Sequence, residues 1–281
     1  MISIGSMPLV RLQGSPAKTL FYNDFEERIV ANGGTISNSS LVIIDSFVNG
    51  CKADGTWDII SQGIVMPFVG NNLAAAVTPL CAPYGAIVTS YGFVNGDYSE
   101  AAGLTGNPIL AKYIDTGVAA TKFPGNFSQG FYSRSESSAV GGKDCGAIDN
   151  TLPPGQSRIY MSALDIFNGR ALAYGYSSSG QIAITVTDSL GFYLAIRQSD
   201  TDLRLLKKGV QIGSNTTPGG LPCTGNNFIF GYNLSGDPNP LRNPSGRTCG
   251  FYMFTPGMTL AQGVSVSTRV QDMQTSLGRN V

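Results

Sequence analysis

The sequence contains no histidine, and this absence excludes several kinds of chemistry. Serine and cysteine nucleophiles usually depend on an imidazole base, as in Ser-His-Asp and Cys-His arrangements. Zinc sites commonly use imidazole ligands, and histidine is the side chain that ordinarily titrates near neutral pH. The sequence therefore excludes a triad hydrolase, a Cys-His nucleophile and a histidine-ligated zinc site.

Charged residues are also scarce. They make up 13% of the 281 residues, and 18 basic side chains balance 18 acidic ones. An average domain has about 25% charged residues, so the surface of this protein must be largely neutral. Nucleic-acid binding depends on clustered basic side chains that displace counterions from phosphates, and no basic run is present. We expect no nucleic-acid partner.

Long apolar runs are missing as well. The longest ones fall far short of the ~20 residues that a helix needs to cross a bilayer. The first residues, Met1 to Gly5, lack the cationic start of a secretion signal. We expect neither membrane insertion nor entry into the general secretion route.

No two cysteines form a C-x-x-C pair, although the chain contains five: Cys51, Cys81, Cys145, Cys223 and Cys249. Their number is odd and their spacing wide, so a metal cluster is not expected. Isolated buried thiols in a reducing compartment are favoured over a disulfide framework.

Glycine and proline are abundant, with 36 and 15 residues, while 42% of the chain is hydrophobic. This composition is typical of short strands joined by tight turns around a sizeable core. Residues 1–22 follow neither a helical nor a strand period, and we predict an extended N-terminal arm that docks on a neighbour. Residues 23–95 are predicted to form a small, partly helical docking region, and 96–281 the main β domain.

Four helical segments are expected in the docking region. Asn23 or Asp24 can cap a first helix that ends at Gly33, and Ser39 can cap a second that ends at Gly50. The second helix has one apolar stripe, formed by Leu41, Ile44, Phe47 and Val48. Shorter helical turns are predicted around Trp57 and from Leu73 to Val77.

Beyond Tyr84 the pattern changes to short runs separated by turn residues. Bulky residues at every second position, as in Ile182 to Val186 and Phe192 to Ile196, allow one face of each strand to line a core. Lys207, Lys208 and Gly209 are predicted to form a hairpin turn, and the sequence does not determine the type of this turn. Ten strands are predicted, covering 112–114, 130–133, 158–163, 171–176, 182–187, 191–197, 203–207, 210–212, 228–232 and 251–254. The pattern favours an antiparallel β-sandwich, and helical spacing from Val266 to Leu277 predicts a closing C-terminal helix.

Several short stretches carry a family resemblance: Phe47 to Asp58, Asn95 to Tyr98, Gly103 to Asn107, Lys112 to Gly117, Asp202 to Val210 and Leu277 to Val281. With them the chain beyond the arm resembles bacteriophage virion structural proteins that carry a laminin-G-like, concanavalin-A-like jelly-roll sandwich. The resemblance implies a location in the virion, assembly in the bacterial cytoplasm and no catalytic residues. The hairpin departs from the family, because Lys208-Gly209 stands where Asn-Gly is common.

Glycoside hydrolysis is the enzymatic alternative, since two carboxylates in a groove need no histidine. Calcium binding is another use of carboxylates, with Asp200 and Asp202, or Asp144 and Asp149, as ligands. The carboxylates considered all follow turn-like sequence, where Asp bonds its own backbone: Asp144, Asp149, Asp165, Asp188, Asp200 and Asp202. We therefore assign no catalytic, cofactor-binding or metal-binding residue, and expect no cofactor.

Sugar binding would use aromatic rings beside planar polar groups. The aromatic candidates in the strands are Tyr174, Tyr176, Phe192, Tyr193, Tyr232, Phe251 and Tyr252. Alternation in a sandwich turns about half of each strand inward, so most of them are expected in the core, as is Trp57. The glycine pairs Gly141-Gly142 and Gly219-Gly220 match neither a P-loop nor a dinucleotide motif and are predicted to be turns.

The sequence thus predicts a protein that is not an enzyme. It is expected to be a virion structural component, a tail-fibre or appendage subunit or a head-decoration protein, that assembles with other virion proteins. A homo-oligomer is expected, with a trimer as one candidate. The alternatives are a carbohydrate-binding module that attaches to host surface glycans and, second, a glycan depolymerase.

Overall fold

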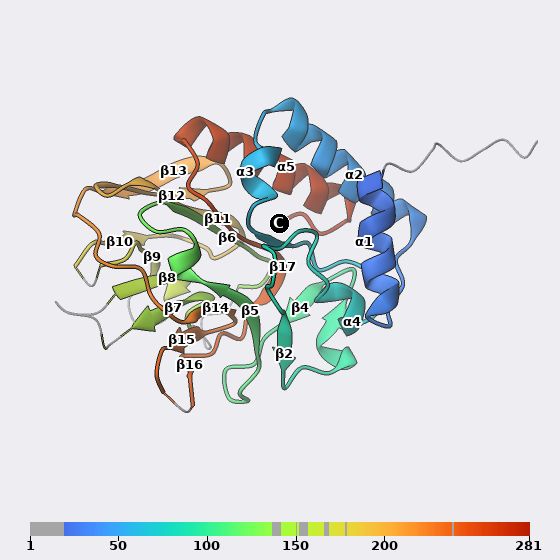
Figure 1. Cartoon of the computed structure of the whole chain (residues 1–281), viewed down its shortest axis with the longest axis horizontal. Coiled ribbons are helices and arrows are strands. Elements are labelled where there is room, and N and C mark those ends of the chain that lie inside the picture. Colours follow the sequence, from blue (N-terminus) through green and yellow to red (C-terminus); the bar gives the residue numbers. More distant parts are fainter. Residues whose placement is uncertain are drawn as a thin grey trace, which may run out of the picture.

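The protein is a three-layered molecule in which two antiparallel sheets stack and helices cover one of them (Figure 1). The computed structural model describes residues 20–136, 142–149, 151, 157–165, 169–177, 179–237 and 239–281. The predicted class, a mainly β antiparallel sandwich with a C-terminal helix, is confirmed. Most of the predicted arm, 1–19, lies outside the described residues, while residues 20–22 belong to the first helix.

Sheet A lies beneath the helices. Its strands are, in spatial order, β13 (Val210–Asn215), β12 (Asp202–Lys207), β11 (Gly191–Ser199), β6 (Phe127–Ser133), β17 (Thr248–Thr255), β4 (Gly103–Thr105) and β3 (Tyr98–Ser99), with β1 (Ile64–Met66) also on β17.

Sheet B forms the other layer. Its order is β10 (Gln181–Thr185), β9 (Arg170–Tyr174), β8 (Ser157–Asp165), β7 (Cys145–Asp149), β14 (Asn226–Ile229), β5 (Tyr113–Ala119) and β2 (Thr89–Tyr91). A short parallel contact adds β15 (Tyr232–Leu234) beside β7, and β16 (Leu241–Arg242) pairs with β15.

The alternation predicted for the strands is present, but both faces of sheet A are buried. On β11, Tyr193 and Ala195 face sheet B, whereas Phe192, Leu194 and Ile196 face the helices. The sequence predicted burial on one face only. The second face is buried because the helical layer covers it, and a strand covered on both sides needs apolar residues throughout.

The helical layer consists of α1 (Leu20–Ala31), α2 (Asn38–Ala53), α5 (Leu260–Ser276) and the single turns α3 (Trp57–Ile60) and α4 (Leu73–Ala76). The long helices α2 and α5 pack together, and an ion pair between Asp54 and Arg269, 2.8 Å from Oδ2 to Nε, joins the end of α2 to the middle of α5. Among the described helices, none is long and apolar enough to cross a membrane.

Three predicted helix boundaries are wrong. The first helix begins at Leu20, before Asn23 and Asp24. The second is capped by Ser37, whose Oγ accepts from the Ser40 amide at 3.1 Å, and it continues past Gly50 to Ala53. Gly50 lies inside the helix, where the Arg269 side chain crosses it, and a Cβ there would lie 2.8 Å from Arg269 Cδ. Glycine at this position allows α5 to pack closely against α2 and does not end the helix.

The region 23–95 also supplies strands to both sheets, since β1 pairs with β17 and β2 pairs with β5. The turns predicted at Trp57 and Leu73 are present as α3 and α4. The structure thus joins the helical region to the sandwich through backbone hydrogen bonds as well as through side-chain packing.

All ten predicted strands are present. The part of the chain that the structure describes contains seven further strands that the sequence did not predict: β1, β2, β3, β4, β7, β15 and β16. Most of these are two or three residues long, too short for a period to show, and β7 contains Gly146. The predicted hairpin is confirmed. Lys208 and Gly209 both have positive φ, 51° and 81°, which makes the turn type I′.

The closing helix α5 has a capping box formed by Thr259 and Gln262, and Gly278, with φ of 69°, follows its end as predicted. The next residue, Arg279, is fully buried and donates to the carbonyl oxygens of Phe68, at 2.9 Å, and Pro67, at 3.1 Å. Burial lowers the pKa of Arg279 to about 10. These bonds fix the chain end to the segment after β1.

All five cysteines are free thiols, and four of them are buried, as expected. Burial raises the pKa of Cys51 to about 12 and that of Cys223 to about 11. Thiols of this kind pack as small apolar side chains and are poor nucleophiles.

Candidate functional site

The outer face of sheet B is the face that the long helices leave uncovered. Figure 1 shows α1, α2 and α5 gathered on the side of sheet A. Outward residues of sheet B alternate with residues of the inner core: on β5, Ile114, Thr116 and Val118 are buried, and the residues between them are half-buried. Side chains that could meet a ligand are therefore found on this face.

A stack of three aromatic rings crosses this face from the edge of the sheet. Tyr91 of β2 and Tyr113 of β5 lie opposite each other with ring centroids 4.5 Å apart and planes 12° apart. Phe228 of β14 continues the stack, 4.5 Å from Tyr113. Tyr91 is 42% exposed, so the outermost ring is open to solvent.

Next to these rings lies a carboxylate, Asp115, which follows Tyr113 by one outward position on β5. Its Oδ1 accepts from the Gly117 amide at 2.8 Å, and its Oδ2 accepts from Asn226 Nδ2 at 3.4 Å. Burial raises the pKa of Asp115, and these two hydrogen bonds oppose the rise. Asp115 and Asn226 together place acceptor and donor groups beside an aromatic surface.

A hollow of about 350 Å³ lies at the far end of β5. The strand contributes Gly117 and Ala119, whose small size leaves the space, and Lys122 follows. The loop Pro83 to Ala86 forms the other wall, and its Tyr84 ring is fully exposed at 105%. Gly117 has a φ of 67°, and a Cβ there would lie 2.5 Å from the Ile87 amide nitrogen, so this wall requires glycine.

A second aromatic group lies farther along the same sheet. Tyr160 of β8 has its ring centroid 4.3 Å from Tyr174 of β9 and 5.9 Å from Tyr232 of β15. With Ile148 and Leu234 these rings form an apolar cluster separate from the two large cores. We call Tyr160, Tyr174 and Tyr232 the outer tyrosine cluster.

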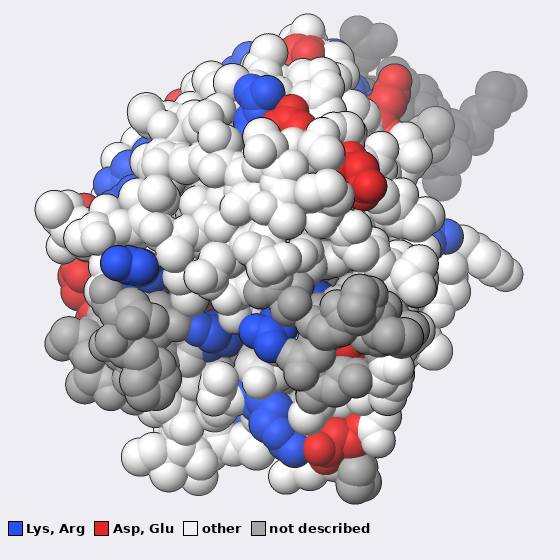
Figure 2. Space-filling view, turned by 90° about the vertical axis from the view of Figure 1, so that its left-hand side faces the viewer, with Lys and Arg blue, Asp and Glu red and all other residues white. Residues whose placement is uncertain are grey.

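Cationic side chains surround the outer tyrosine cluster. Lys143 Nζ lies 5.2 Å from the centre of the Tyr160 ring, and Arg158 Cζ lies 5.9 Å from that of Tyr174. Arg242 of β16 is opposite Tyr232 and forms an ion pair with Asp237, 2.5 Å from Nη2 to Oδ2. Figure 2, which views the left-hand side of Figure 1, shows Lys and Arg gathered in the lower centre of a largely uncharged face.

The carboxylates weighed from the sequence each have a structural partner where their side chains are described. Asp188 pairs with Lys207, Asp200 with Arg197 and Asp202 with Arg204. The sequence suggested that Asp144 and Asp149 lie in solvated turns. In the structure both side chains are fully buried. Asp144 pairs with Arg247, and Asp149 accepts from Thr151 and Thr224. The side chain of Asp165 lies outside the described residues.

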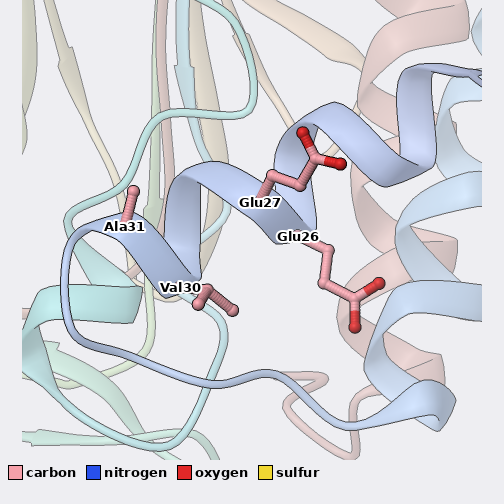
Figure 3. Close-up of a pocket in the computed structure, with 4 residues that line it drawn as sticks. All are labelled: Glu26, Glu27, Val30 and Ala31. Carbon is pink, nitrogen blue, oxygen red and sulfur yellow. The ribbon is translucent and has the colours of Figure 1, made fainter.

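The four carboxylates weighed as calcium ligands, Asp144, Asp149, Asp200 and Asp202, thus already interact with protein groups. Within the described ranges no group of three or more His, Cys, Asp or Glu side chains could hold a metal ion. Another cavity, about 370 Å³ on α1, is lined by Glu26, Glu27, Val30 and Ala31. Figure 3 shows the two carboxylates of this cavity pointing in different directions, so they do not form an apposed pair.

The seven aromatic candidates divide among three environments. Phe192 and Phe251 pack under the helices, while Tyr176, Tyr193 and Tyr252 lie between the sheets. Tyr174 and Tyr232 alone of the seven reach the outer face. Trp57 is packed against the helical core, as expected.

Sequence reasoning missed Tyr84, Tyr91, Tyr113 and Asp115 as site residues. The alternation Tyr113-Ile114-Asp115 was a usable signal for a strand with polar outward positions. Nothing in the sequence marks Tyr84, because its exposure depends on the path of a loop across the end of β5.

No family model matches the chain, and no curated protein matches it. Among solved structures, a mutant of Trypanosoma rangeli sialidase displaying trans-sialidase activity aligns at 12% identity with a TM-score of 0.45, over 86% of this chain and 40% of the sialidase. This chain therefore spans about two fifths of that protein.

Two binding domains are also similar. The CBM40 domain of Ruminococcus gnavus IT-sialidase, bound to alpha2,3 sialyllactose, aligns at 11% identity over 58% of this chain and 96% of that domain, with a TM-score of 0.42. The binding domain of Paraclostridial Mosquitocidal Protein 1 aligns at 11% identity over 76% of this chain and 52% of that one, with a TM-score of 0.44. These values are low, and the fold assignment rests on the sheet topology itself.

Proposed function

We propose that this protein is a carbohydrate-binding module that acts by noncovalent attachment. The observation that carries the proposal is the composition of one face of sheet B. The exposed Tyr84 ring stands beside an open hollow at one end of β5, and the Asp115 carboxylate, its Asn226 amide partner and the exposed Tyr91 ring lie towards the other end. Sugars bind through stacking of their C–H faces on aromatic rings, together with a few hydrogen bonds that fix orientation.

Attachment rather than hydrolysis is proposed because of what the described carboxylates do. Asp144, Asp188 and Asp202 are ion-paired, and Asp115 is held by a backbone amide and an asparagine. Hydrolysis of a glycosidic bond requires two carboxyl groups that flank the bond, one of them free to donate a proton. A location on a virion, which the sequence resemblance implies, is compatible with a module that only binds.

Removing either exposed ring should weaken sugar binding. We expect Tyr84→Ala and Tyr91→Ala each to reduce glycan affinity about tenfold, because a lost stacking contact is worth roughly 1 kcal/mol or somewhat more. Binding is measured on an array of bacterial surface glycans and then by calorimetry with the best ligand. Both side chains are exposed, so the variants should fold normally.

The matched control is Val210→Ala, an exposed apolar side chain at the sheet A hairpin, 66% exposed. It should bind as the unchanged protein does. The proposal is contradicted if the unchanged protein binds no glycan on the array. It is also contradicted if both tyrosine variants bind as tightly as the unchanged protein.

A second candidate function, assembly with further copies of the chain, is favoured by a different surface. Val94, Ile109 and Leu110 are 61%, 90% and 54% exposed. Their loops are adjacent, since a Cβ on Gly92 would lie 2.9 Å from the Ala111 oxygen. The short edge strands β2 and β3 end the two sheets. Exposed apolar patches beside sheet edges are typical of interfaces, and a second copy offers the same surface in return.

If this surface joins copies, the double variant Ile109→Ser with Leu110→Ser should shift the native mass from oligomer to monomer. Native mass spectrometry measures this directly. Val264→Ser, an exposed position on α5, is the matched control and should leave the mass unchanged. If the unchanged protein is a monomer at micromolar concentration, self-assembly through this surface is ruled out.

A further inference from the structure

We infer that the outer tyrosine cluster is a subsite for an acidic sugar, one that carries a carboxylate. The inference rests on the proposed carbohydrate-binding function and adds the class of ligand. Stacking alone would suit any pyranose, but this part of sheet B combines three tyrosine rings with three cationic side chains: Lys143, Arg158 and Arg242.

The rings and cations converge on Tyr232. Its ring stacks on Tyr160 at 20° between planes and is half-buried, so one part of it remains accessible. Arg242 is the strand partner of Tyr232 in the β15–β16 pair, and Arg158 Cζ lies 5.9 Å from the centre of the neighbouring Tyr174 ring. A pyranose ring on Tyr232 would therefore have a guanidinium group within reach of its carboxylate.

Guanidinium groups match a carboxylate better than ammonium groups do, because their planar N–H donors bind both oxygens at once. Arg242 Nη2 donates to one carboxylate oxygen of Asp237, and its Nη1 donates to the carbonyl oxygens of Asn239 and Leu241. The Arg158 side chain lies along the Tyr174 ring, and the Tyr174 hydroxyl donates to Gln181 Oε1. These contacts hold the rings and the guanidinium in place before a ligand arrives.

The backbone beneath the cluster is built to fit it. Gly146 lies opposite Tyr160 in the β7–β8 pair, and a Cβ at Gly146 would lie 2.4 Å from the Tyr160 Cβ. The absence of a side chain at this position lets the Tyr160 ring lie close to the sheet. The cluster is thus a fixed platform, separate from the hollow beside Tyr84.

The test compares a glucuronic-acid-containing oligosaccharide with its carboxyl-reduced form, which differs only in charge. The unchanged protein should bind the acidic form about tenfold more tightly, and raising the salt from low to high concentration should remove most of that preference. Arg158→Gln and Arg242→Gln should each reduce the preference for the acidic form severalfold.

The matched control is Arg204→Gln, which removes a partly exposed arginine from β12 in sheet A and should keep the preference. Equal binding of the two sugars, with binding still weakened about tenfold in Tyr84→Ala, would overturn the acidic-sugar inference and leave the proposed function standing. Binding of neither sugar would overturn the inference, and absence of binding to every glycan of the array would overturn the proposed function as well. If a single-stranded oligonucleotide binds as tightly as the acidic sugar, the acidic-sugar inference is also overturned, because the cluster would then recognise phosphate.

Discussion

Replacing Asp144 by alanine is expected to lower the free energy of unfolding by about 3–5 kcal/mol, a large part of the total stability of an ordinary domain. Asp144 and Arg247 are both completely buried, with 3.2 Å between Oδ1 and Nε. Asp144 also accepts from Ser245 Oγ at 2.6 Å and from the Ala163 amide at 2.7 Å. Its loss would leave the Arg247 charge in the interior without its carboxylate.

Urea unfolding at neutral pH measures this loss. The control is Asp202→Ala, whose partner Arg204 is even closer, at 2.7 Å, but both side chains are about 30% exposed. Exposed pairs contribute at most about 1 kcal/mol, so this variant should be nearly as stable as the unchanged protein. The double variant Asp144→Leu with Arg247→Met, which removes both charges, should lose less than Asp144→Ala. Similar losses in Asp144→Ala and Asp202→Ala would show that burial of the pair does not matter.

The second large effect is expected at Gly146, in the middle of β7. Its φ of 143° is a conformation that side chains rarely adopt, and a Cβ would lie 2.2 Å from the Ile159 oxygen. Gly146→Ala should therefore cost about 3 kcal/mol or more, from backbone strain together with overpacking. Thermal unfolding followed by circular dichroism should show a correspondingly lower Tm.

Gly125→Ala is the matched control. Gly125 also has positive φ, 85°, but a Cβ there meets no atom within 4 Å. It should cost only about 1 kcal/mol, the ordinary penalty of a left-handed alanine. If both variants lose the same amount, the close approach of β8 to Gly146 contributes nothing to stability.

Much of the fold was accessible from the sequence because it depends on local periods. Alternation in Phe192 to Ile196 gave β11, and helical spacing from Val266 to Leu277 gave α5. The strands that were missed are those with too few residues for a period, together with β7, where Gly146 interrupts the apolar run. Helix ends were less well predicted, because Gly50 is a packing residue under Arg269 rather than a stop.

The candidate site was accessible only in part. The sequence directed attention to Tyr174 and Tyr232 as two of seven aromatic candidates. It predicted that most of the seven lie in the core without identifying which, and the structure puts the other five there. It pointed away from a carboxylate pair, but it put Asp144 in a turn, whereas the structure buries it against Arg247. A buried ion pair between residues a hundred positions apart leaves no local pattern.

The sequence by itself determined the class of the protein: a neutral, histidine-free, turn-rich chain whose alternating strands must stack as a sandwich. Tertiary structure alone decided which face of that sandwich stays open. Helices from both ends of the chain cover sheet A, so the rings of Tyr91, Tyr160 and Tyr232 are left on sheet B. Alternation separates the two faces of a strand, but only the packing of distant segments determines which face meets solvent.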